Sequence, residues 1–70
     1  MNLEEAKNLV ENMLEKYSKI FSANELLMWT DGLIEGLVQS GILEFKELDV
    51  GLLRQHRVRT IQQKKPGEFL

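Results

Sequence analysis

A helix-capping pattern between two apolar stretches limits how this chain folds more than any other feature. Ser22-Ala23-Asn24-Glu25 places a serine three residues before a glutamate, and an apolar run follows directly. This pattern marks the first turn of a helix, because each of the two side chains bonds the other residue's backbone N–H group. The preceding apolar stretch ends at Phe21, so the connection is very short. Two helices joined so tightly are usually antiparallel neighbours.

The stretch before Ser22 has the periodicity of an amphipathic helix over residues 3–21. Asn2 is a candidate N-cap for this helix, with Glu5 in the reciprocal position. Polar residues fill one face, and apolar residues recur at three- and four-residue spacing on the other. These apolar positions are Leu3, Ala6, Val10, Met13, Leu14, Tyr17 and Phe21.

A second amphipathic helix is expected over residues 23–40. Gly41 follows it at the position where helices often end on a left-handed residue, which glycine adopts without steric cost. The apolar stripe expected to face the core is Leu26, Leu27, Thr30, Leu33, Ile34, Leu37 and Val38.

The third segment, residues 49–63, has a weaker pattern. Asp49 is its candidate N-cap, but Gln55 and His56 occupy positions that a core-facing helix would fill with apolar residues. A strand over residues 57–62 is the alternative, because β-branched residues are frequent there. We favour the helix, which gives an all-α prediction: a small three-helix domain built on an antiparallel helix pair.

Length and composition limit the domain organisation and the chemistry of the chain. The 70 residues form one domain, expected over residues 1–63, and Pro66 and Gly67 indicate a flexible C-terminal tail over residues 64–70. A domain of this size has a stability of only roughly 3 to 10 kcal/mol, so association with a second protein surface would help it. The absence of cysteine removes disulfides, thiolate nucleophiles and cysteine-ligated zinc.

Two glycines and the single tryptophan share a face of the second helix. At about 100° per residue, Trp29, Gly32 and Gly36 lie together, away from the stripe expected to face the core. Glycine inside a helix costs about 1 kcal/mol relative to alanine, so this face requires an explanation. One explanation is contact with a second copy or another protein. The others are that the third segment of the same chain covers the face, or that the helix breaks at Asp31-Gly32.

The C-terminal part of the chain is basic, whereas the remainder is acidic. Residues 1–51 hold ten of the eleven acidic residues and only four of the nine basic ones. The basic C-terminal residues are Arg54, Arg57, Arg59, Lys64 and Lys65. They can pair within the chain or remain solvated, dock on an acidic protein, or bind nucleic acid. The low overall pI of about 5.3 disfavours nucleic acid.

Catalysis has little support in the sequence. His56 is the only histidine, and neither a nucleophile motif nor a phosphate-binding glycine loop is present. We therefore expect no enzyme, no cofactor, no metal and no small-molecule substrate. The N-terminus lacks the features of a signal peptide and no segment is long and apolar enough to cross a membrane, which predicts a cytoplasmic protein without a membrane partner.

The expected function is protein–protein interaction, as a regulatory or accessory protein that associates with itself as a homodimer or with another protein. Two groups of residues are expected to make the contact, Trp29, Gly32 and Gly36 on one hand and Arg54, Arg57 and Arg59 on the other. The alternative is a small nucleic-acid-associated regulator that uses the basic residues of segment 54–65 on phosphate.

Overall fold

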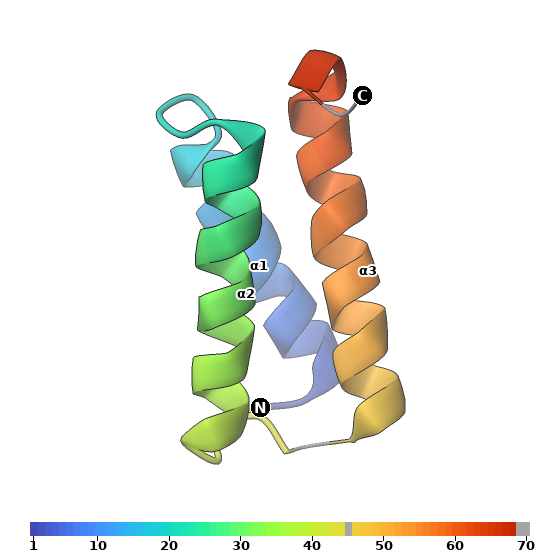
Figure 1. Ribbon diagram of the computed structural model, residues 1–70. Helices are drawn as coiled ribbons and strands as arrows, with labels where there is room; N and C mark the ends of the chain where they lie inside the picture. Colours follow the sequence, from blue (N-terminus) through green and yellow to red (C-terminus); the bar gives the residue numbers. More distant parts are fainter. Residues whose placement is uncertain (45, 69–70) are drawn as a thin grey trace.

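The computed structural model describes residues 1–44 and 46–68, and it confirms the all-α prediction (Figure 1). Three helices, α1 (Leu3–Tyr17), α2 (Ala23–Gln39) and α3 (Glu47–Lys64), are followed by a single 3-10 turn, η1 (Pro66–Glu68). α2 runs antiparallel to α1, and α3 runs antiparallel to α2, in the same general direction as α1, and packs against both. The third segment is therefore a helix and not a strand.

Both predicted capping boxes are present. The Asn2 side chain accepts a hydrogen bond from the Glu5 backbone at 2.8 Å, and the Glu5 carboxylate accepts one from the Asn2 backbone at 3.1 Å. Ser22 and Glu25 bond each other in the same way, at 3.3 Å and 3.1 Å. These four bonds satisfy N–H groups that have no partner inside the helices, and so they fix where α1 and α2 begin.

The predicted end of α1 was wrong by four residues. The helix ends at Tyr17 and not at residue 21, and the backbone N–H groups of Ile20 and Phe21 both bond the Tyr17 carbonyl, at 3.0 Å and 3.1 Å. The apolar periodicity continues to Phe21, but the chain has to reverse before Ser22, and these bonds make the reversal. Ile20 is consequently 69% exposed.

The predicted start of α3 was also wrong. The helix begins at Glu47 with Lys46 as its N-cap, and Lys46 makes no side-chain capping bond. Asp49 therefore lies in the first turn, where its negative charge still interacts favourably with the helix dipole. The end of α2 agrees with prediction, since Gly41 adopts a left-handed φ of 79° and its N–H bonds the Val38 carbonyl.

The core lies between the three helices. α3 packs along both α1 and α2, whereas α1 and α2 contact each other less. α1 and α2 contribute residues of the apolar stripes that their spacing predicts, whereas α3, whose pattern is weaker, contributes Val50, Leu53 and Ile61 and leaves Leu52 40% exposed. The buried apolar residues are Ala6, Val10, Leu14, Ala23, Leu26, Ile34, Leu37, Leu43, Val50, Leu53 and Ile61.

The described part of the predicted tail folds against the rest of the domain. Glu68, in η1, accepts a hydrogen bond from the backbone N–H of Ala23 at 2.8 Å, and Lys65 lies 3.7 Å from the same carboxylate. Residues 69 and 70 lie outside the described residues. Flexibility of segment 64–70 stays a prediction.

Candidate functional site

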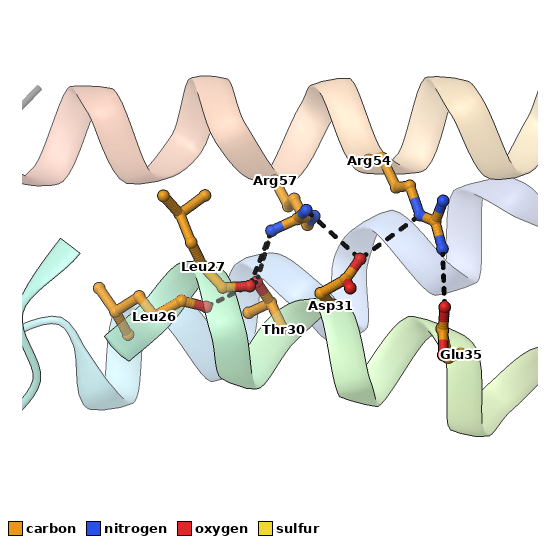
Figure 2. A network of polar contacts seen from close by, with 7 residues as sticks. All are labelled: Leu26, Leu27, Thr30, Asp31, Glu35, Arg54 and Arg57. Atoms are coloured by element: carbon orange, nitrogen blue, oxygen red, sulfur yellow. Dashed lines mark hydrogen bonds and ion pairs between the residues drawn. The ribbon is translucent and has the colours of Figure 1, made fainter. Parts of the chain in front are cut away.

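The residues predicted to form one contact site lie in separate places. Trp29, Gly32 and Gly36 lie on the side of α2 that faces away from the core. Arg54 and Arg57 reach from α3 to carboxylates and carbonyls of α2 (Figure 2). The structure therefore contains two features, an exposed helix face and an ionic network between helices.

The outward side of α2, which we call the glycine face, consists of Glu25, Met28, Trp29, Gly32 and Gly36. Both glycines are exposed, and a Cβ atom placed on either one would have no neighbour within 4 Å among the described residues outside its own helix. The third segment does not cover this face, so that explanation was wrong. The helix also continues through Asp31-Gly32, so the explanation by a helix break was wrong too.

Trp29 is a fixed, half-buried edge of the glycine face. Its ring stands nearly perpendicular on Tyr17, with 5.2 Å between ring centroids and 77° between the planes. Phe21, Glu25, Met28 and Trp29 line a shallow, mostly apolar hollow of about 400 Å³. Met28 is 77% exposed beside it. Sequence reasoning missed Phe21 and Met28 as members of this surface, although Met28 is the neighbour of Trp29 off the core stripe.

The second feature is centred on Arg57, which crosses from α3 to α2. Its guanidinium donates to the Leu27 carbonyl at 2.9 Å and to the Thr30 hydroxyl at 3.3 Å, and lies 3.5 Å from the Asp31 carboxylate. The side chain is only 12% exposed. Burial lowers the pKa of Arg57, and the Asp31 charge opposes this shift. Thr30 is fully buried and donates in turn to the Leu26 carbonyl at 2.6 Å.

Arg54 extends the network along the same side of α2. Its guanidinium lies 3.6 Å from Asp31 and 3.5 Å from Glu35, so Asp31 is shared by two arginines. Sequence reasoning did not identify these two acidic partners. The spacing of these residues could have indicated the ion pairs. Asp31 and Glu35 are four residues apart, so they lie on one side of α2. Arg54 and Arg57 are three residues apart, so they lie on one side of α3.

Three more contacts join the basic C-terminal part to acids of the same chain. His56 lies 2.8 Å from Glu11, Lys64 contacts Glu15, and Lys65 is near Glu68. Within residues 1–44 and 46–68, Arg59 is the one member of the basic group without a carboxylate in ion-pair range, and it is exposed. The basic end is therefore used mainly to hold α3 on α1 and α2.

Acid is expected to destabilise the fold through two of these carboxylates. The Lys64 side chain holds the pKa of Glu15 below its ordinary value, and the Ser22 backbone N–H does the same for Glu25. A carboxyl group with a lowered pKa in the folded state stabilises above its ordinary pKa of 4.5, and the contribution is lost as the pH falls through the folded-state pKa. Urea unfolding at pH 7 and pH 3 measures the loss. A Glu15→Gln, Glu25→Gln chain should lose less stability than the parent, and an equal loss would contradict the assignment.

Known proteins give no further guide to this surface. Comparison with protein-family models, curated proteins and solved structures found no match. In the described part of the chain, no three histidine, cysteine or acidic side chains gather in a way that could hold a metal ion. No helix there has the length and apolar character to cross a membrane.

Proposed function

We propose that this domain is a non-catalytic protein-interaction module that associates with a second copy of itself through the glycine face. The observation that carries the proposal is the open space over Gly32 and Gly36 beside the half-buried Trp29. Each glycine costs α2 about 1 kcal/mol relative to alanine, and within the described residues neither makes a turn or a close contact that would require glycine. A closely approaching helix would give both glycines a function.

Trp29 supports the same conclusion. Tryptophan is enriched among the residues that contribute most to protein interfaces, because it buries a large rigid surface for little loss of conformational freedom. The contact with Tyr17 already holds the ring in place, and the adjacent hollow supplies apolar surface. A second copy is a sufficient partner, since a domain this small gains stability from extra burial.

The nucleic-acid alternative has less support. Four of the five basic C-terminal residues already contact carboxylates of their own chain, so phosphate would have to displace those contacts. Among the five basic C-terminal residues, only Arg59 has no ion pair within residues 1–44 and 46–68. A regulatory or accessory role and a cytoplasmic location stay predictions from the sequence.

The fluorescence of Trp29 tests the proposal, because it is the only tryptophan in the chain. A dimer that buries Trp29 should emit at shorter wavelength when concentrated and shift to longer wavelength on dilution. The transition should change little between low and high salt, because an apolar contact is not screened. Emission that is independent of concentration while the mass changes would show that the interface lies elsewhere. A transition abolished by salt would favour an ionic contact.

A further inference from the structure

The N-terminal and C-terminal halves of the glycine face differ in shape, and this difference indicates the orientation in which a second copy would pack. We propose that the two α2 helices pack antiparallel about a two-fold axis at Gly32, so that Trp29 of each copy lies over Gly36 of the other. This inference rests on the proposed self-association, and it adds the orientation and the residue pairs.

Shape is the first argument for the antiparallel orientation. Met28 and Trp29 make the N-terminal half of the glycine face bulky, whereas Gly36 leaves its C-terminal half flat. Trp29 and Gly36 lie within roughly 20° of each other around the helix axis. A two-fold axis at Gly32 turns the bulky half of one copy onto the flat half of the other. A parallel pair would set Trp29 against Trp29 and hold the glycines apart.

Trp29 also leans in the direction that this pairing needs. Helical side chains tilt toward the N-terminus of their own helix, so the ring covers the surface about one residue before its own Cα. In an antiparallel pair centred on Gly32, that position lies opposite Gly36 of the second copy. The missing Cβ of Gly36 provides the space for the ring.

Charge is the second argument. A parallel pair would oppose Glu25 to Glu25, whereas the antiparallel pair sets Glu25 near the uncharged Gln39. Lys16 lies over the Tyr17 ring, 5.3 Å from its centroid, and therefore beside the Trp29 end of the face. The last turn of α2 has no basic residue of its own, and the Met1 ammonium group donates at 3.0 Å to the Ile42 carbonyl, which lies three residues beyond the end of the helix. The antiparallel arrangement brings Lys16 of one copy toward that turn of the other.

Disulfide cross-linking tests the pairing, and the chain has no cysteine to interfere. Helix axes about 8–10 Å apart place the two Gly32 Cα atoms roughly 3.5–5.5 Å apart at the crossing, which overlaps the range for a disulfide. The two Met28 Cα atoms would be separated by roughly 12 Å along the axis, whereas Met28 of one copy would lie beside Glu35 of the other. The variants are G32C, E35C and M28C, with G51C on the outer side of α3 as the control for random collision.

Under mild oxidation, we expect G32C to form a covalent dimer almost completely. E35C and M28C should each cross-link no more than G51C, but an equimolar mixture of the two should give the mixed disulfide. Efficient self-cross-linking of M28C would show a parallel pair and overturn the proposal. Cross-linking at no position above the G51C control, in chains that light scattering shows to be dimeric, would place the interface elsewhere. A parent chain, without any introduced cysteine, that remains monomeric at the same concentrations would instead refute the proposed function itself.

Discussion

Replacing Gly36 with glutamine is expected to stabilise the single chain and abolish the dimer. Glutamine is a good helix former, and no described neighbour lies within 4 Å of a Cβ at this position, so α2 should gain about 0.5–1 kcal/mol. The same side chain would occupy the space into which Trp29 of the second copy is proposed to pack. Urea unfolding at a concentration where the chain is monomeric measures the gain, and light scattering at high concentration measures the loss of dimer.

The control for this prediction is Gly51→Gln in α3. Gly51 is also an exposed helical glycine with open space at its Cβ, so the substitution should give a similar gain in stability. It lies outside the glycine face and should leave the mass unchanged. A Gly36→Gln chain that dimerises as well as the Gly51→Gln chain would contradict the proposed interface, whatever its stability.

Arg57→Glu is expected to have the largest effect on stability, roughly 2–4 kcal/mol, because the Arg57 side chain is only 12% exposed and its replacement buries an unpaired carboxylate. The substitution removes the bonds to the Leu27 carbonyl and the Thr30 hydroxyl, and it places a carboxylate beside Asp31. Against a total stability of roughly 3 to 10 kcal/mol, much of the chain would unfold. Thermal unfolding followed by circular dichroism measures the effect.

Arg59→Glu is the matched control, because Arg59 is exposed and lies two residues away on the outer side of the same helix. Its effect on stability should stay within about 0.5 kcal/mol. Equal stability of the two variants would contradict the structural role of Arg57. The comparison also separates an effect on folding from an effect on nucleic-acid binding. Loss of nucleic-acid retention in the Arg59→Glu chain would support the alternative function of a nucleic-acid-associated regulator. Loss of retention in the Arg57→Glu chain alone would reflect unfolding.

Local signals in the sequence predicted most of the fold. The two capping boxes act within four residues, so Ser22 and Asn2 could be placed without knowledge of the rest of the chain. Helix ends were harder where the chain itself reverses. The apolar pattern of α1 continues into the turn at Phe21, and α3 begins at Glu47 after Lys46, which makes no side-chain capping bond, so neither boundary carries a local signal.

The candidate site was only partly predictable, because it depends on the path of α3. The periodicity of α2 placed Trp29, Gly32 and Gly36 on one face, but it left open whether another part of the chain covers them. α3 packs on the other side of α2, where Arg57 meets Thr30 and Asp31. That choice exposes the glycines and at the same time places Arg54 and Arg57 in ion pairs with α2 of their own chain, and a role of the two arginines in partner binding stays a prediction.

Molar mass in solution tests the central claim most directly. Light scattering across a concentration series, at low and high salt, should show a rise from 8.1 kDa to twice that value, with little dependence on salt. A Trp29→Ala chain should remain at the lower mass through the same series. A parent chain that stays at 8.1 kDa under all conditions would contradict self-association through the glycine face.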